Sequence, residues 1–260
     1  MTSQRRHELK DREWERLEKY FPERQPGQLG RPRNDERQML NGILCVVKTG
    51  APWRDLPERY GAWNSVYSRF VEWQKSGLFQ MILEELGLEA DLQDMSMDSS
   101  CSHAHQHSAG AKKGAENSDV NQHIGTSRGG KTTKIHVIVD ALGNPIHVHL
   151  SAGNLHDSTE AETALSDVPL EGTVVLADKA YGAKAIRDSI TNRGASYCIP
   201  PKSNEKHPWE CDWFLYKERH LVECFFQKLK QFRGVATRYN KLACRFLAFV
   251  QLASIMIWLA

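Results

Sequence analysis

The sequence lacks the close cysteine pairs of a zinc or redox site, because none of its six cysteines are spaced as C-x-x-C. They lie in apolar stretches, and we interpret them as free, buried thiols in a reducing compartment. A long hydrophobic run is also lacking. The C-terminal stretch 246–260 is apolar, but it is too short to cross a bilayer and contains Gln251. We therefore expect a buried core helix there, and the charged first residues predict no secretory signal peptide.

An excess of charge of one sign is absent as well. Lysine and arginine total 34 against 32 aspartates and glutamates, which gives a formal net charge of +2. This balance does not by itself indicate a nucleic-acid partner, so the placement of the charges has to decide. Hydrophobic residues at 40% and charged residues at 25% are ordinary for a globular protein and exclude disordered and fibrous classes.

Residues 8–87 have the apolar spacing of helices. One helix is expected over 35–50, and a short helix over 54–60 meets Gly61 before a further helix over 63–77. A helix, a glycine-containing turn and an amphipathic helix resemble a helix-turn-helix unit, although a packing or dimerisation subdomain has the same pattern. Basic side chains favour DNA binding: Arg31, Arg33, Arg37, Lys48, Arg54, Arg59, Arg69 and Lys75.

After residue 90 the pattern changes to strands alternating with helices. Residues 132–140 alternate strongly between polar and apolar side chains, and a turn at Gly143 leads into a partner strand. The expected order is strands at 95–99, 132–140 and 145–151, a helix at 158–165, a strand at 173–177, a helix at 183–192, a strand at 196–199 and a long helix from 217. This order predicts an α/β domain, a mixed sheet flanked by helices. The chain would then divide into a helical domain, 1–90, and an α/β domain, 91–260.

Two loops carry unbalanced positive charge. The loop 22–34 holds Arg24, Arg31 and Arg33, and the loop 102–131 holds several lysines, including Lys131. A loop as long as 102–131 within a domain is usually functional or disordered. We expect it to become ordered on DNA, although a surface loop without a role has the same composition.

Three carboxylates stand out. Asp98 lies within a predicted strand, where aspartate is disfavoured. Asp178 closes another predicted strand, at the edge where α/β sheets place ligands, although a turn or cap aspartate would look the same. Glu223 lies on a helix, and at about 100° per residue it shares a face with other polar side chains. These are Tyr216, Arg219, Gln227 and Lys230. A solvated helix face with an Arg219–Glu223 pair is the alternative interpretation.

Together the three acids favour phosphodiester chemistry. Such chemistry is well served by two divalent ions, one at the attacking and one at the leaving oxygen. Mg²⁺ prefers hard oxygen ligands, and carboxylates from separate elements supply them. Arg219 and Lys230 would hold the scissile phosphate.

The motifs are similar to those of a known family. The spacing Tyr216-x2-Arg219-x3-Glu223-x6-Lys230 resembles the Y-R-E-K signature of bacterial insertion-sequence transposases of the DDE (Asp-Asp-Glu) superfamily. Residues 177–182 and 97–99 resemble the segments around its second and first aspartates. The segments 153–157 and 50–57 resemble a recurrent segment after the hairpin and the helical leader of the IS-five group.

This resemblance implies a ribonuclease-H-like catalytic domain preceded by the all-α, helix-turn-helix-like domain. It implies cleavage at the ends of an insertion sequence and joining of the 3′-OH ends to target DNA. Asp98, Asp178 and Glu223 would be the catalytic acids and would bind two Mg²⁺ or Mn²⁺ ions per site. Tyr216, Arg219 and Lys230 would position DNA phosphates. His156 and Asp157 would support the acids, and a helix N-cap is the alternative for Asp157.

Further DNA contacts are expected along 224–245, a stretch without acidic residues. We expect Arg233 and Arg238 to contact DNA, together with Lys131 and Arg69. His103, His105 and His107 lie in a predicted loop, and we favour a position near DNA over a metal site. Trp209 and Trp213 could stack on an unpaired base, but buried packing is the favoured interpretation.

The expected partners are the terminal inverted repeats of the element and its target DNA. A homodimer is expected because two ends must be held together, and the expected location is the cytoplasm, associated with the nucleoid. A DNA-binding regulator, such as a decayed and inactive transposase, is the alternative function, and a related nuclease that cuts without joining is a third. The intact spacing of the acids argues against decay.

Overall fold

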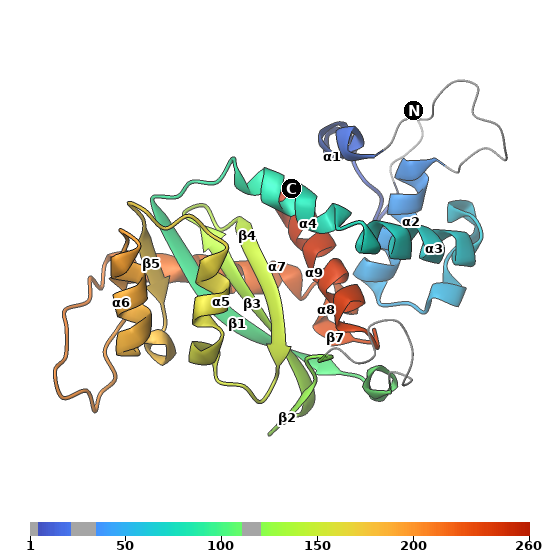
Figure 1. Ribbon diagram of the computed structural model, residues 1–260. Coiled ribbons are helices and arrows are strands. Elements are labelled where there is room, and N and C mark those ends of the chain that lie inside the picture. Colours follow the sequence, from blue (N-terminus) through green and yellow to red (C-terminus); the bar gives the residue numbers. More distant parts are fainter. Residues whose placement is uncertain (1–4, 22–34, 111–120) are drawn as a thin grey trace.

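The computed structural model describes residues 5–21, 35–110 and 121–260 (Figure 1). The arginine-rich loop expected at 22–34 and part of the loop expected at 102–131 lie outside these residues.

The first third of the chain is helical, as predicted. The helix α2 begins after Asp35, whose carboxylate accepts hydrogen bonds from the backbone N–H groups of Arg37 and Gln38, and it ends at Gly50 with φ of 70°. The elements of this region are α1 (Asp11–Leu17), η1 (Glu18–Tyr20), α2 (Glu36–Thr49), η2 (Trp53–Asp55), η3 (Glu58–Tyr60), α3 (Trp63–Lys75) and α4 (Leu78–Gly87).

The helix expected over 54–60 was wrong. The segment forms two single 3₁₀ turns, each preceded by a proline, Pro52 and Pro57. Proline has no N–H to donate and fixes φ, so an α-helix cannot run through Pro57 without losing a hydrogen bond. The helix-turn-helix unit expected around Gly61 therefore lacks its first helix.

The rest of the chain is a mixed α/β unit. Its strands are β1 (Asp94–Ala104), β2 (Gly125–Ser127), β3 (Gly130–Asp140), β4 (Pro145–Ala152), β5 (Val174–Ala177), β6 (Ser196–Cys198) and β7 (Thr237–Arg238). Its helices are η4 (Gln106–Ala109), η5 (Asp157–Thr159), α5 (Ala161–Ser166), η6 (Lys179–Tyr181), α6 (Lys184–Asn192), η7 (Leu215–Arg219), α7 (His220–Leu229), α8 (Arg233–Ala236) and α9 (Ala243–Trp258).

The main sheet runs in the order β4-β3-β1-β5-β6. The first three strands are antiparallel, and β5 and β6 continue the sheet in parallel with β1. A hairpin followed by crossovers is the arrangement expected for a ribonuclease-H-like domain, and the predicted mixed sheet with flanking helices is confirmed. The short strands β2 and β7 extend the sheet beside β3 and β1.

The strand β1 is longer than predicted, and the expected loop 102–131 is partly strand. Ser102 is fully buried and pairs with Thr133 of β3. Its hydroxyl donates to the carbonyl of Val235 at 2.7 Å. This long-range contact satisfies a serine that the local sequence had placed in a loop.

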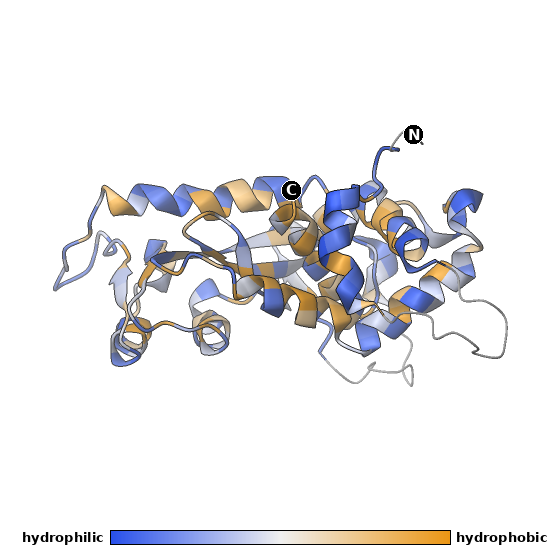
Figure 2. Cartoon of the chain, turned by 90° about the horizontal axis from the view of Figure 1, so that it is seen from above, coloured by the Kyte–Doolittle hydropathy of each residue, from blue (hydrophilic) through white to orange (hydrophobic). Residues whose placement is uncertain are grey.

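Helices cover both faces of the sheet (Figure 1). Met95 and Met97 of β1 pack in one hydrophobic cluster with α5 and α6. Ile135 and Val137 of β3 pack in a second cluster with α4, α7 and α9. In Figure 2 hydrophobic and hydrophilic residues alternate along the helices, as expected for helices that bury one side.

The N-terminal helices share that second cluster. Phe70 of α3 packs edge-on against Phe249 of α9, with ring centroids 5.1 Å apart. The buried core helix expected at the C-terminus is confirmed as α9, and no helix in the described ranges is long and apolar enough to span a membrane. The domain boundary near residue 90 stays a prediction.

The cysteines only partly match the expectation. Cys45 and Cys198 are free and buried, whereas Cys101 is exposed on β1. Cys101 lies in the second half of β1, where its side chain points to solvent and that of Ser102 points inward. The sequence pattern had not indicated that the strand extends this far.

Candidate active site

The sheet register brings two of the predicted acids together. Met97 of β1 pairs with Ala177 of the parallel strand β5. The residues that follow them, Asp98 and Asp178, therefore lie side by side on neighbouring segments. Met97 and Ala177 point into the cluster beneath α5 and α6, and side chains alternate along a strand. Asp98 and Asp178 therefore lie on the side covered by α7.

Arg219 connects the third acid to the first. Its guanidinium donates to Asp98 Oδ2 at 2.8 Å and to Glu223 Oε1 one helical turn away. The side chain of Asp98 is 24% exposed and that of Glu223 is 53% exposed. One arginine thus bridges two carboxylates, with Asp178 on the neighbouring strand.

The site holds more negative charge than Arg219 balances. Burial raises the pKa of Asp98, the negative charge of Asp178 adds to the rise, and the ion pair with Arg219 opposes it without cancelling it. Burial disfavours the charge of Arg219 itself, yet Asp98 and Glu223 raise its pKa above the usual value. Further positive charge would be stabilised here.

The donor set suits a hard divalent cation, because all three acids present carboxylate oxygens. In the parts of the chain that the structure describes, no three His, Cys, Asp or Glu side chains are already grouped to hold a metal ion. Arg219 stands between Asp98 and Glu223, so their oxygens would have to leave it to share an ion. The residues fit such an ion in chemistry, without forming a preassembled cage.

The helix that carries Glu223 is amphipathic, as predicted. Val222, Phe225 and Leu229 are buried. Tyr216 precedes the helix in η7 and is half-buried, with the Arg219 guanidinium 5.9 Å from its ring centroid. Lys230 follows the helix and is exposed.

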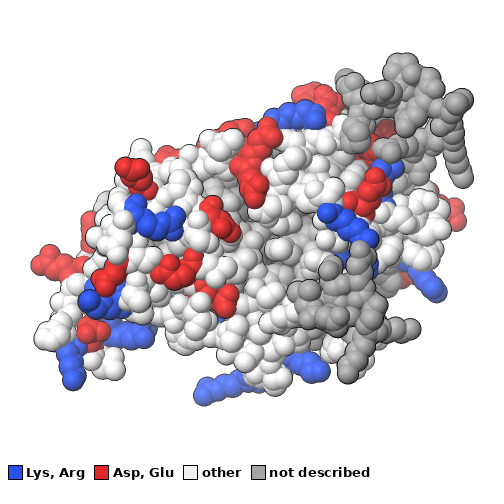
Figure 3. Space-filling view, viewed as in Figure 1, with Lys and Arg blue, Asp and Glu red and all other residues white. Residues whose placement is uncertain are grey.

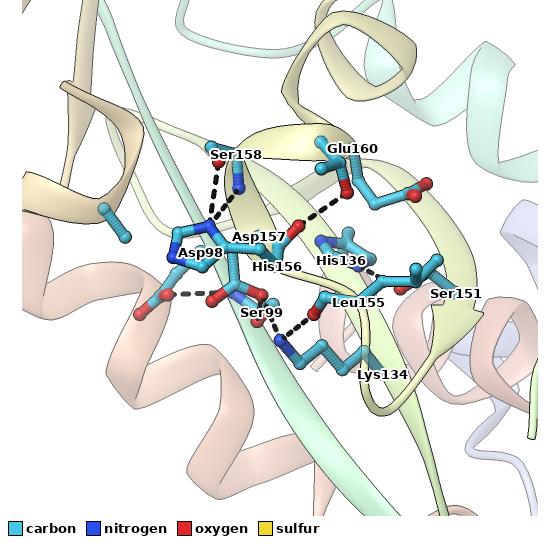
Figure 4. A network of polar contacts seen from close by, with 12 residues as sticks. Asp98, Ser99, Lys134, His136, Ser151, Leu155, His156, Asp157, Ser158 and Glu160 are labelled. Carbon is cyan, nitrogen blue, oxygen red and sulfur yellow. Dashed lines mark hydrogen bonds and ion pairs between the residues drawn. The ribbon is translucent and has the colours of Figure 1, made fainter. Parts of the chain in front are cut away.

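Asp157, which the resemblance implied would support the acids, lies behind Asp98 in a network with Ser99 and Lys134, two partners that the sequence interpretation had missed (Figure 4). Ser99 donates to Asp157 Oδ1 at 2.6 Å, and Lys134 donates to the same oxygen at 2.8 Å. Burial alone would raise the pKa of Asp157, but the hydrogen bonds from Lys134 and Ser99 outweigh it and lower that pKa. Because Ser99 follows Asp98, the network fixes the backbone that carries the first acid.

Tyr181 was also missed. It is 1% exposed, and burial raises its pKa, with the negative charges of Asp157, Asp98 and Asp178 adding to the rise. The phenol packs in the hydrophobic cluster that contains Met97 and Ala177. Its position three residues after Asp178 was the one sequence signal that could have pointed to it.

His156 lies at the rim of a small cavity beside Asp178. Its Nδ1 accepts from the backbone N–H of Ser158 at 3.3 Å, so in the neutral ring the proton is on Nε2. His156, rather than Asp157, is the N-terminal cap of η5. The cavity has a volume of about 340 Å³ and is lined by His156, Asp178, Lys179, Ala180, Lys202, Ser203 and Asn204. Two lysines and a histidine N–H suit an anionic group.

The predicted DNA contacts divide into exposed and engaged residues. Lys131 and Arg233 are exposed. Arg69 is largely buried, with ion pairs of 3.6 Å to Glu36 and 3.2 Å to Glu72. These ion pairs occupy its guanidinium between two helices.

Arg238 is a correction. It is fully buried and donates to Thr133 Oγ1 and to the carbonyl of Gln122, both at 2.7 Å. A guanidinium enclosed in this way stabilises the sheet edge and does not contact DNA. Its basic neighbours in the sequence gave no sign of this burial.

The two tryptophans also differ from each other. Trp209 packs as expected, with its indole N–H donating to Ile199 O at 2.7 Å and Arg187 3.6 Å from its ring centroid. Trp213 is 62% exposed, so the burial expected for it was wrong. His103, His105 and His107 form no metal site with other side chains in the described ranges.

Family comparisons agree along the chain. Residues 9–83 match a family described as "Putative transposase of IS4/5 family". Residues 89–208 and 175–260 match two families that are both described as "Transposase DDE domain".

Curated relatives carry the same description. The chain is 42% identical over 129 residues to a "Putative transposase for insertion sequence element IS6501" of Brucella ovis, which covers 49% of this chain and 98% of the relative. It is 28% identical over 142 residues to a "Putative transposase for insertion sequence element IS402" of Burkholderia cepacia, covering 51% of this chain and 65% of the relative.

Among solved structures, one match is the "Mos1 transposase paired-end complex with left transposon end". The TM-score is 0.29 at 13% identity, over 94% of this chain and 83% of the other, and a likeness this low supports no conclusion. The family matches and the Brucella relative do support one. The chain belongs to the insertion-sequence transposases of the IS4/5 family, and its catalytic part is a transposase DDE domain.

Proposed function

We propose that Asp98, Asp178 and Glu223 are the acids with which this transposase cleaves the ends of its insertion sequence and joins the 3′-OH ends to target DNA. The observation that carries the assignment is the bridge from Arg219 to Asp98 and Glu223, beside Asp178. Three carboxylates that are far apart in sequence meet on one side of the sheet.

DDE transposases use divalent metal ions. We propose two Mg²⁺ or Mn²⁺ ions, held by Asp98, Asp178 and Glu223. Bound ions would activate the attacking oxygen and stabilise the leaving oxygen of the phosphodiester. Burial and mutual repulsion of Asp98 and Asp178 support a cation at this position.

The chain's own side chains would orient the substrate. Arg219, with five N–H donors in a planar fork, would release a carboxylate and hold the scissile phosphate in its place. Tyr216 and Lys230 would position the neighbouring backbone. His156, through its Nε2–H, would donate to a phosphate oxygen in the cavity beside Asp178.

The partner is DNA, and we propose the terminal inverted repeats and a target duplex as the segments bound. Two ends must be brought together before joining, so a homodimer assembled on DNA is part of the proposal. The exposed positions of Lys131 and Arg233 support DNA contacts outside the acid site.

The test is cleavage of a supercoiled plasmid that carries the gene with its native flanks. Glu223→Gln should abolish flank cleavage and leave DNA binding intact, because only the charge of one carboxylate is removed. Glu218→Gln is the matched control, since Glu218 is exposed in η7 and should leave cleavage unchanged.

Cutting that requires both the metal and Glu223 would establish the assignment. A Glu223→Gln protein that still cuts would contradict it. Binding without cutting in any metal would favour a regulator or an inactive transposase.

A further inference from the structure

A second basic cavity lies away from the acids, where the N-terminal segment meets α2, α7 and α9. Its volume is about 790 Å³. Arg5 and Arg6 line it from the segment before α1, Lys48 from the end of α2 and Lys228 from α7, with Phe232 among the apolar lining residues. Elements distant in sequence thus contribute cations to one space.

Lys48 is half-buried in the lining of this cavity. Burial lowers its pKa, and the positive charge of Lys10 opposes protonation further, while Glu13 partly compensates. Its ammonium lies 5.7 Å from the ring centroid of Phe232. Among the described residues neither Lys48 nor Lys228 has a hydrogen bond or ion pair to a carboxylate. A half-buried ammonium in this state gains from an incoming anion.

The acidic groups around the cavity are already engaged. Glu13 forms an ion pair with Lys10 at 3.5 Å, and Glu8 forms one with Arg59 at 3.7 Å. Five lysine and arginine side chains line the cavity against these two glutamates. Positive charge therefore remains in excess, although the whole chain has a net charge of only +2 and the face in Figure 3 mixes both signs.

Close packing fixes the helix that presents Lys48. A Cβ on Gly234 would lie 3.0 Å from the carbonyl oxygen of Val47, and a Cβ on Gly50 would lie 3.3 Å from the Arg233 Cβ. Glycines at both positions let α8 contact the end of α2 directly. Close packing against α8 therefore fixes the backbone that carries Lys48.

The cavity adjoins the helix that carries the third acid. Glu223 and Lys228 are both exposed on α7, and five residues of helix place them about 8 Å apart along the axis and roughly 140° apart around it. That separation is within the span of a single bound duplex, whose strands carry a phosphate about every 3.4 Å.

We propose that this cavity binds a backbone phosphate of the DNA duplex whose neighbouring segment occupies the acid site. The inference rests on the proposed function for the choice of DNA as the anion. It adds a second contact with DNA. On the protein side this contact is made by the N-terminal segment, α2 and α7, and on the DNA side by a strand beyond the cut. Such a contact would position the duplex without reading its sequence.

The test measures binding and not cleavage. Lys48→Gln and Lys228→Gln are made in the Glu223→Gln background, and the Kd for a labelled duplex carrying the element's end is measured by anisotropy across a salt series. Each substitution should weaken binding roughly fivefold and lower the slope of log Kd against log salt by about 0.9, because one phosphate contact is lost. Lys184→Gln is the control, since Lys184 is exposed and pairs with Asp188 on α6.

An unchanged salt slope in both variants would overturn the inference. If Lys48→Gln lowers the melting temperature, its binding result is set aside and the result for Lys228→Gln decides the test. Lys228 is exposed, so its replacement should not disturb the fold. Inorganic phosphate is the second probe. The DNA assignment is wrong if phosphate raises the melting temperature of the Glu223→Gln protein, Lys48→Gln removes that rise, and neither substitution changes duplex affinity. The cavity would then hold a free anion. Because binding is measured in the Glu223→Gln background, either outcome leaves the assignment of the acids unaffected.

Discussion

Arg219 is the residue on which the electrostatics of the acid site depend. It pairs with both Asp98 and Glu223, yet burial and Asp178 still hold the pKa of Asp98 above its usual value. An arginine in this position stabilises the site before substrate arrives, and its planar fork suits a phosphate once it does. The same side chain therefore serves folding and binding.

Replacing Arg219 by Gln should lower cleavage roughly a hundredfold, as expected for loss of one charged donor at a reacting phosphate. The pKa of Asp98 should rise further, because only the backbone hydrogen bond from Ser99 would then oppose burial and the charge of Asp178. Since an ionised Asp98 is needed, the acidic limb of the pH–rate profile should move to higher pH.

Arg219→Lys is the matched variant. It keeps the positive charge but loses the fork, so its rate should fall while the acidic limb stays near that of the parent. An acidic limb at the same pH in Arg219→Gln would contradict this account of Asp98.

The β3–β4 hairpin has an unusual interior, because it buries His136 and His147 and half-buries His149. His136 and His149 stack with ring centroids 4.6 Å apart, and His147 lies 3.2 Å from His149 through their ring nitrogens. Burial lowers the pKa of His136 to about 4. Burial and the neighbouring histidines together lower the pKa of His149 to about 3. Both rings are neutral in the folded protein.

This hairpin should make the protein sensitive to mild acid. The unfolded chain binds protons at these histidines below about pH 6.5, whereas the folded chain resists them, so stability is complete above that pH and is lost as the pH falls towards 4. His136, 2% exposed, would account for at most roughly 3 kcal/mol of that loss.

Urea unfolding at pH 7.5 and pH 5 measures this effect. His149→Gln should flatten the difference between the two conditions, and His220→Gln, at an exposed position, should leave it unchanged. Equal stability of the parent protein at both pH values would contradict the prediction.

The whole molecule is organised around one large hydrophobic cluster that joins the N-terminal helices to the α/β unit. Phe79 and Leu83 of α4 belong to the same cluster as Phe249 of α9 and Val148 of β4. Side chains of this size stabilise a fold by roughly 1.5–3 kcal/mol each when buried. Losing several of them exceeds the total stability of an ordinary domain, which is on the order of 5–15 kcal/mol.

A fragment of residues 91–260 should therefore aggregate or unfold when it is expressed alone, because α9 and β4 would expose their apolar faces. Size-exclusion chromatography and thermal unfolding of the fragment beside the full chain measure this. A monomeric fragment with a cooperative transition would instead support residue 90 as a boundary between folding units.

Much of the chain was predictable from local pattern. The carboxylate of Asp35 and the backbone freedom of Gly50 mark the ends of α2, and the apolar residues Ile135, Val137 and Val139 mark β3, although the structure also buries His136 and Ile138 between them. The spacing of Tyr216, Arg219 and Glu223 led to the transposase family. These signals depend on residues close together in the sequence, so they can be recognised without knowledge of the fold.

Burial of polar residues was not predictable in the same way. Arg238 has the composition of a DNA contact, yet Gln122 and Thr133 enclose it from more than a hundred residues away. Trp213 has the composition of a core residue, yet it is exposed. Whether a side chain meets water depends on segments that the local sequence does not specify.

The local sequence was sufficient to predict most of the helices, most of the strands, the family and the three candidate acids, because periodicity, caps and motif spacing are properties of neighbouring residues. Only the tertiary structure decided that Arg219 joins Asp98 to Glu223, that Ser99 and Lys134 hold Asp157, and that Lys48 and Lys228 share one cavity. The reason is physical: charges act through space over a few ångströms, and folding sets those distances between residues that the chain keeps far apart.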